Sequence, residues 1–242
     1  MHPLTLPVAG GLIILAAAVN LLAYALGRPN AQGTGRMHPA LQRSTSALLA
    51  LAAWAFVGLG ATSQLTAPYA RWIALGMSLS FIADLIMAAM LKVPNRVLGG
   101  MAVFGLAHLA YLAGFLGLNN ALALATGPAM LGGVATALLI ACAAWWFTVD
   151  APQAPRSLRF GALGYLVLLA AMTGVACAIT SRAPQLGSLA AGACLFGLSD
   201  AILGNQILRQ HHWPGVSDVV WASYIVGQAG IVWSVYPALL MG

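Results

Sequence analysis

Two of the chain's four acidic residues, Asp84 and Asp200, lie deep inside long apolar segments, and the chain contains no Glu. An ionised side chain at the centre of a bilayer costs about 2.5–3.5 kcal/mol on insertion scales. A carboxyl held away from water is expected to keep its proton near neutral pH, which suits a general acid. We therefore predict that Asp84 and Asp200 are catalytic or handle protons. The structural alternative is a protonated Asp that hydrogen-bonds one helix to the next.

The apolar segments that carry these residues are long enough to cross a membrane. Of the 242 residues, 61% are hydrophobic and 6% are charged, whereas a soluble domain carries roughly 25% charged residues. A spanning helix needs about 20 apolar residues. The first segment is too long, and lacks the basic start, for a secretory signal peptide. We predict an all-α, polytopic membrane bundle that forms one domain over residues 1–242, with eight transmembrane helices at 5–27, 43–63, 69–91, 97–118, 122–147, 158–180, 187–208 and 217–241.

The basic residues are distributed unevenly over the expected loops. The odd-numbered loops hold eight of them: Arg28, Arg36, Arg43, Lys92, Arg96, Arg156, Arg159 and Arg209. Only Arg71 and Arg182 lie in even-numbered loops. The positive-inside rule then places the odd loops in the cytoplasm and both termini outside, as in a multi-pass protein of the bacterial inner (plasma) membrane. Since the net charge of +6 is spread by loop, no nucleic-acid partner is expected, and the oligomeric state stays open.

The surroundings of the two aspartates are similar. Asp84 lies in GMSLSFIADLIMAAM and Asp200 in AGACLFGLSDAILGN, 116 residues further on. His108 follows Asp84 by 24 residues, as Tyr224 follows Asp200. We predict a parallel duplication of four plus four helices, in which both halves share one orientation. Counted from the expected helix ends, both carboxyls lie roughly 10–12 Å below the cytoplasmic boundary, a depth that permits one shared cavity.

Other polar side chains occupy the expected helices. We predict that substrate is bound by Ser80, His108, Tyr111, Tyr165, Ser199, Tyr224 and Gln228. For each of these, the alternative is ordinary packing or a hydrogen bond within the bundle. Asp150, in a loop, and Asp218, at a helix start, suit capping or helix-dipole positions and are assigned to structure. The free thiols Cys142, Cys177 and Cys194 are expected to pack as small apolar groups, and no metal site is expected.

Four stretches of this chain resemble the YhhN family of integral membrane proteins, the lysoplasmalogenases. They are GMSLSFIADLIM, MAVFGLAHLAYLAGF, GACLFGLSDAIL and the region of Tyr224 and Gln228. The resemblance is clearest over the third to eighth helices. It implies hydrolysis of the vinyl-ether bond of a lysoplasmalogen to a fatty aldehyde and a glycerophospho-head-group alcohol, without metal or organic cofactor. The family usually has Gly where this chain has Ala83, which narrows the space beside Asp84.

The two carboxyls suit the reaction that the resemblance implies. A vinyl ether is hydrolysed by protonation of its β-carbon, and water captures the resulting oxocarbenium ion. One carboxylic acid could give the proton while a second carboxylate stabilises the cation and orients water, as in glycosidases; Asp84 is the preferred acid. Two alternatives stay open: a proton-coupled transporter that uses the same Asp pair, and a lipid-binding protein without catalytic activity.

Overall fold

The helices of the predicted bundle are all present in the computed structural model, which describes residues 3–60 and 66–241. Within these residues there is no strand, and eight helical stretches are long and apolar enough to cross a membrane. They are α1 (Thr5–Leu26), α2 (Pro39–Ala55) continued by the π-helical turn η1 (Phe56–Gly60), α3 (Ala67–Met87), α4 (Arg96–Ala121), α5 (Gly127–Ala144) continued by η2 (Trp145–Val149), α6 (Arg156–Arg182), α7 (Gly187–Leu208) preceded by the 3-10 turn η3 (Pro184–Leu186), and α8 (Val216–Trp233) followed by α9 (Val235–Met241). The all-α, eight-span prediction is confirmed.

Two helix boundaries differ from the predicted ones for a visible backbone reason. The third span ends at Met87 rather than 91, where Ala89 takes a left-handed φ of 57°. The fifth begins at Gly127 rather than 122, after Ala123 with a φ of 47°. The second span begins earlier than predicted, at Pro39, and its predicted end at residue 63 lies outside the described residues.

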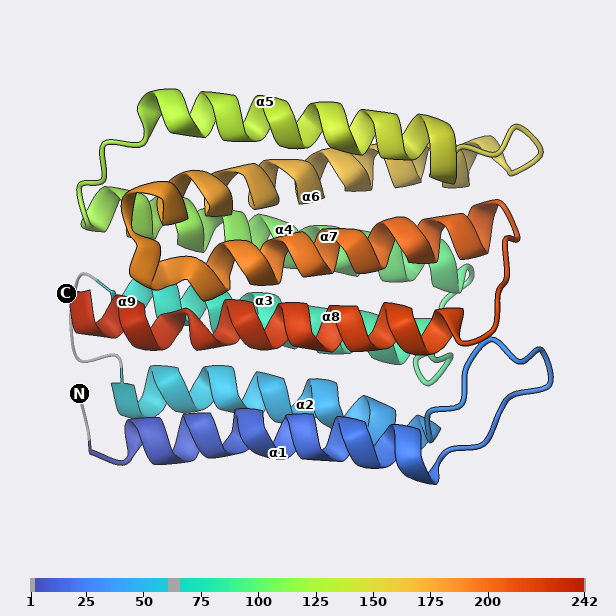
Figure 1. Ribbon diagram of the computed structural model, residues 1–242, viewed down its shortest axis with the longest axis horizontal. Coiled ribbons are helices and arrows are strands. Elements are labelled where there is room, and N and C mark those ends of the chain that lie inside the picture. The colour runs from blue at the N-terminus through green and yellow to red at the C-terminus, as the bar shows by residue number, and fades with distance from the viewer. Residues whose placement is uncertain (1–2, 61–65, 242) are drawn as a thin grey trace.

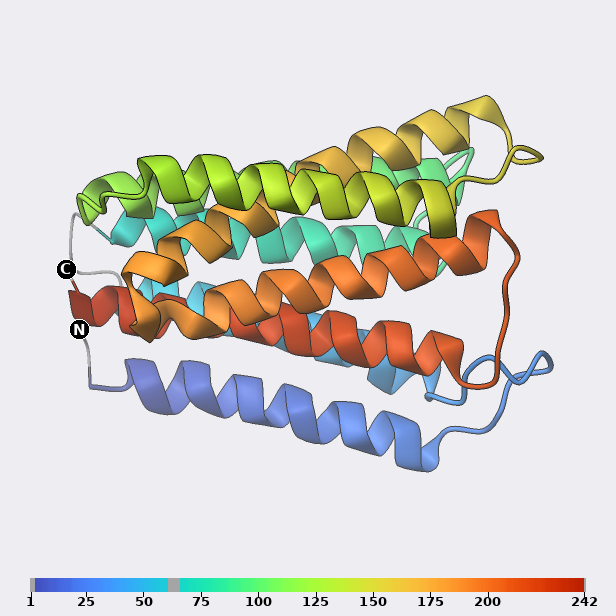
Figure 2. The ribbon, with the colours of Figure 1, turned by 45° about the horizontal axis from the view of Figure 1, so that its top comes forward.

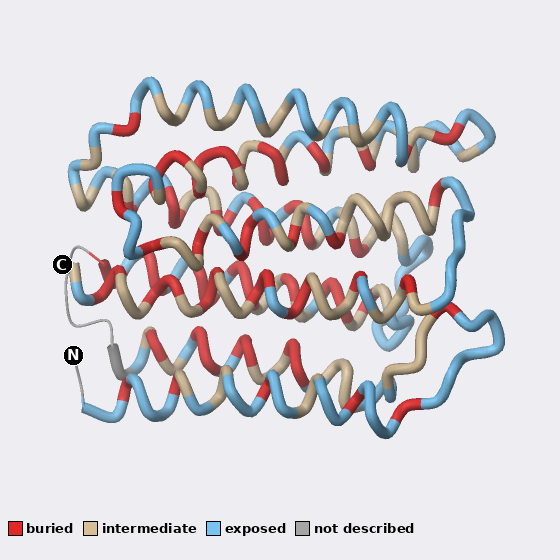
Figure 3. The backbone as a smooth tube through the Cα atoms, viewed as in Figure 1, coloured by how far each residue is buried: buried red, intermediate tan, exposed pale blue. Residues whose placement is uncertain are grey.

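Helices adjacent in sequence pack in pairs, α1 with α2, α3 with α4, α5 with α6 and α7 with α8. The pairs are joined through contacts of α2 with α3, α4 with α6 and α6 with α7, and α8 also reaches α2 and α3. Two helices, α1 and α5, lie at opposite edges of the bundle (Figures 1 and 2). Figure 3 shows α5 without a buried residue, while burial concentrates on the central helices. The site must therefore be built from α2, α3, α4, α6, α7 and α8.

Glycines allow the central helices to approach closely. A Cβ on Gly192 of α7 would lie 2.6 Å from the carbonyl oxygen of Gly227 on α8, so the two backbones touch. At the matching place in the first half, a Cβ on Gly76 of α3 would meet the ring of Tyr111 on α4 at 2.4 Å. Gly192 lies 116 residues after Gly76, and Gly227 lies 116 residues after Tyr111. The two aspartates have the same spacing. This correspondence supports the predicted duplication.

The bundle has one basic end, which we define by the loops 27–38, 88–95, 150–155 and 209–215. Helix α1 begins and α9 ends at the opposite end (Figure 1). At the basic end, the Asp218 carboxylate accepts backbone N–H bonds from Arg36 at 2.9 and 3.0 Å and from Met37 at 3.1 Å. Asp150 pairs with Arg159 at 2.6 Å. Both acidic residues assigned to structure thus hold loops in place.

Candidate active site

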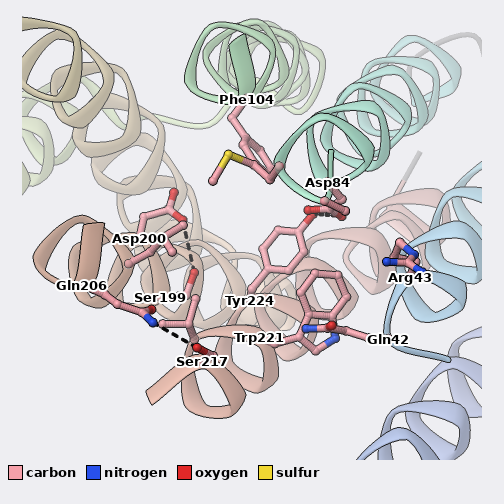
Figure 4. A pocket seen from close by; sticks show the side chains of 14 residues that line it. Gln42, Arg43, Asp84, Phe104, Ser199, Asp200, Gln206, Ser217, Trp221 and Tyr224 are labelled. Carbon is pink, nitrogen blue, oxygen red and sulfur yellow. Dashed lines mark hydrogen bonds between the residues drawn. The ribbon is translucent and has the colours of Figure 1, made fainter. Parts of the chain in front are cut away.

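A cavity of about 240 Å³ lies among α2, α3, α4, α7 and α8, and both Asp84 and Asp200 line it (Figure 4). The equal depth expected for the two residues was counted from predicted helix ends. Because α3 ends at Met87, Asp84 lies only three residues from its helix end, whereas Asp200 lies eight from Leu208. The two carboxyls therefore reach the same cavity although they lie at different distances from the ends of α3 and α7.

Asp84 receives two hydroxyl donors on one carboxyl oxygen. The Ser46 hydroxyl donates to Asp84 Oδ2 at 2.5 Å, and the Tyr224 hydroxyl donates to the same atom at 2.9 Å. Ser46 comes from α2 and Tyr224 from α8, so three helices fix this carboxyl. With only 7% of the residue exposed, the cost of burial is offset mainly by these two bonds.

Asp200 has fewer donors. The Tyr165 hydroxyl, from α6, donates to Asp200 Oδ2. The Ser199 hydroxyl lies 3.3 Å from Asp200 Oδ1, but it also donates to the carbonyl oxygen of Phe196 at 2.9 Å. A hydroxyl has one hydrogen to give, so Asp200 has one undivided donor where Asp84 has two. The two carboxyls on this cavity are chemically unequal.

Aromatic rings hold Tyr224 in place beside Asp84. Its ring lies 5.3 Å from those of Phe196 and Trp221 and 5.9 Å from that of Phe104, measured between centroids. These tilted and edge-to-face contacts are the preferred geometries for aromatic pairs. The Tyr224 hydroxyl therefore has a fixed position from which to donate to the carboxyl.

Five residues predicted to bind substrate do not line this cavity: Ser80, His108, Tyr111, Tyr165 and Gln228. His108 is 1% exposed and packs against Phe196 at 4.9 Å and Tyr165 at 5.0 Å between ring centroids. Its ring nitrogens have no hydrogen-bond partner in the described part of the chain. Tyr111 donates to Gln228 Oε1 at 2.7 Å, and Ser80 is fully buried. The cavity thus holds Asp84, Asp200, Ser199 and Tyr224 of the predicted set, and Tyr165 reaches it through Asp200.

The YhhN family model matches residues 37–235. The chain belongs to the YhhN family. The match spans every helix that lines the cavity, from α2 to α8, and leaves out α1 at the edge of the bundle. No curated protein and no solved structure matches the chain. Within residues 3–60 and 66–241, no three His, Cys, Asp or Glu side chains are grouped so that they could hold a metal ion.

Residues of this YhhN site that the sequence does not single out include Ser46, Arg43 and Trp221. The sequence signal for Ser46 is a hydroxyl in the first turns of the second apolar segment, at the basic end where Asp84 also lies. Arg43 was counted only as a loop charge, because the second span was expected to begin there. The structure extends α2 back to Pro39, which brings Arg43 into the helix and onto the cavity wall.

Two apolar spaces adjoin the cavity of this YhhN protein. The first, about 60 Å³, shares Met87, Phe104, Leu203 and Asp200 with the cavity. The second is a groove of about 390 Å³ between α4 and α6 that shares Met101 and Tyr165 with the first. The groove ends among exposed apolar side chains, including Leu106 and Phe160. Of the two aspartates, only Asp200 borders the apolar spaces.

Proposed function

We propose that this YhhN protein is a lysoplasmalogenase, which hydrolyses the vinyl-ether bond of a lysoplasmalogen to a fatty aldehyde and a glycerophospho-head-group alcohol. The observation that carries the proposal is the pair of unequally hydrogen-bonded carboxyls, Asp84 and Asp200, on one cavity inside a membrane-spanning bundle. A lipid substrate explains a site within the apolar bundle. We place the enzyme in the bacterial inner membrane with its basic end in the cytoplasm.

The hydrogen-bond donors indicate which carboxyl is the acid. Donors directed at a carboxyl favour its ionised form. Asp84 accepts two hydroxyl bonds, from Ser46 and Tyr224, whereas Asp200 has one undivided donor, from Tyr165. We therefore assign Asp200 as the general acid and Asp84 as the carboxylate that stabilises the cation. This assignment reverses the preference drawn from the sequence.

The cavities favour the same assignment. In a lysoplasmalogen, the β-carbon that takes the proton lies on the chain side of the α-carbon, and the ether oxygen leads to the glycerol and its head group. Asp200 borders both the cavity and the adjoining apolar space, where a chain would lie. Of these two spaces, Asp84 borders only the cavity. A substrate whose chain enters the apolar space thus presents its β-carbon to Asp200.

Each step of the proposed reaction balances. Asp200 gives its proton to the β-carbon, and the double-bond electrons form the new C–H bond, leaving an oxocarbenium ion beside the Asp84 carboxylate. Water adds to the α-carbon and gives a proton to the Asp200 carboxylate, which restores the acid and forms a hemiacetal. The C–O bond to glycerol then breaks as the glycerol oxygen gains the hydroxyl proton, releasing aldehyde and alcohol. The net change is the addition of one water, as in acid–base catalysis by paired carboxyls.

Aldehyde release from lysoplasmenyl-ethanolamine by purified protein in detergent tests the proposal. We expect aldehyde from the wild type, and little from Asp84→Asn or Asp200→Asn. Asp150→Asn is the matched control, because Asp150 pairs with Arg159 away from the cavity, and it should release aldehyde at the wild-type rate. No aldehyde from folded wild type would refute the proposal and return attention to transport. Aldehyde from all variants would make the Asp pair structural.

A further inference from the structure

Arg43 stands apart from other arginines at the basic end. It is half-buried on the cavity wall, and no hydrogen bond or ion pair joins it to the described residues (Figure 4). In contrast, Arg159 is bound to the Asp150 carboxylate, and Arg209 donates to the carbonyl oxygens of Asp150 and Trp146. A guanidinium that is partly withdrawn from water without an anionic partner is unfavourable, so its place on a cavity indicates a ligand.

The surrounding part of the cavity is rich in neutral donors. Gln42 lies beside Arg43 in sequence, and both line the cavity. Across from them, Gln206 Nε2 donates to Ser217 Oγ at 3.0 Å, which leaves the Ser217 hydroxyl hydrogen available to a ligand. Arg43 carries the only formal positive charge among the side chains that line this cavity in the described residues. This end of the cavity is suited to an anion.

We propose that Arg43 binds the phosphate of a single-chain phospholipid, with Gln42 and Ser217 as neutral donors; the inference rests on the proposed function. A guanidinium presents five N–H donors in a planar fork that matches phosphate oxygens. Arg43 lies one helical turn, about 4.5 Å along the axis, nearer the basic end than Ser46, which contacts Asp84. Three glycerol carbons separate the phosphate from the vinyl ether, so a phosphate at Arg43 leaves the ether oxygen near the aspartates.

Binding of two non-hydrolysable lipids tests the subsite without turnover. One is 1-O-alkyl lysophosphoethanolamine, and the other is 1-O-alkylglycerol, which has the same chain and no phosphate. We expect Arg43→Gln to weaken binding of the phospholipid by about tenfold or more and to leave binding of the alkylglycerol unchanged. Arg43→Lys should bind the phospholipid with an affinity between those of wild type and Arg43→Gln, since an ammonium keeps the charge without the planar fork of donors. Arg96→Gln, at the basic end but away from the cavity, is the matched control and should bind both lipids as wild type does.

The outcomes separate this inference from the proposed function. Equal losses for both lipids, or no loss for either, in a folded Arg43→Gln protein would overturn the phosphate subsite. Binding of inorganic phosphate alone to wild type as tightly as the phospholipid would assign the subsite to the free anion and overturn it too. Phosphate-dependent binding in a protein that releases no aldehyde would support the subsite while refuting the hydrolase.

Discussion

Replacing Tyr224 with Phe removes one donor from the Asp84 carboxylate and leaves the ring. The hydroxyl donates to Asp84 Oδ2 at 2.9 Å, while the ring packs on Phe104, Phe196 and Trp221. A hydrogen bond to a charged group contributes about 1.5–3 kcal/mol. If Asp84 must be ionised to stabilise the cation, losing this donor lowers the ionised fraction of Asp84 and so raises the barrier to forming the cation. We expect kcat to drop by about 10- to 150-fold, with KM close to the wild-type value because the ground state carries no cation.

Steady-state aldehyde release over a range of lysoplasmenyl-ethanolamine concentrations measures both constants. Tyr69→Phe is the matched control, because the Tyr69 hydroxyl also links α3 to the C-terminal end of α8, through the capping residue Ser234 at 2.5 Å, at the end opposite the cavity. Each variant loses one interhelical hydrogen bond and keeps the packing of its ring. The two proteins should therefore unfold at similar temperatures in detergent, while only Tyr224→Phe loses activity.

Two results would refute this reasoning. If Tyr224→Phe turns over at the wild-type rate, the second donor on Asp84 does not matter to catalysis, and the assignment of Asp84 as the carboxylate fails. If Tyr69→Phe loses as much kcat as Tyr224→Phe, the effect reports the α3–α8 contact in general. Ser46→Ala provides an independent check, since it removes the other donor to the same oxygen.

Two further predictions address the chain groove and the basic end. Gly164 lies in the groove between α4 and α6, and a Cβ added to it would meet no atom within 4 Å, so Gly164→Leu should fold and displace two or three methylenes of a long chain. That displacement costs about 1.6–2.4 kcal/mol, which lowers kcat/KM by about 15- to 60-fold for long-chain but not short-chain substrates. Gly132→Leu, equally unhindered on α5, should leave kcat/KM unchanged for both substrates. An equal loss of kcat/KM at both chain lengths would argue against the groove as the chain site. Asp218→Asn should lower the free energy of unfolding by about 1.5–3 kcal/mol, because a charged acceptor of three backbone N–H bonds is lost; thermal unfolding in detergent measures this, and an unchanged transition would contradict it.

The spans could be predicted from the sequence because hydropathy determines which segments cross a bilayer. The aspartates could be singled out for the same reason, since burying a charge in an apolar segment is costly. The ends of the helices were harder to predict. The turn at Ala89 depends on a left-handed backbone conformation that composition does not reveal. Because this turn ends α3 earlier than predicted, Asp84 lies closer to the end of its helix than the sequence indicated.

The rotation of each helix about its own axis could not be predicted from the sequence. In a soluble protein, an apolar stripe marks the buried face of a helix. In a bilayer, the lipid-facing side is apolar too, so Tyr111 and Gln228 gave the same signal as Tyr224 although they bond to each other outside the cavity. The partnership of Ser46 with Asp84 likewise depends on how α2 is turned against α3.

The hydrogen bond between Asp84 and Tyr224 joins residues 140 positions apart, which has a consequence for how the protein is made. At a synthesis rate of about 5–20 residues per second, Asp84 is added to the chain roughly 7–28 s before Tyr224. Ser46 has already been made and is the one partner available during that interval. The complete donor set on Asp84 therefore forms only when the last span inserts, so a half-made chain in the membrane lacks the arrangement proposed to cleave lipid.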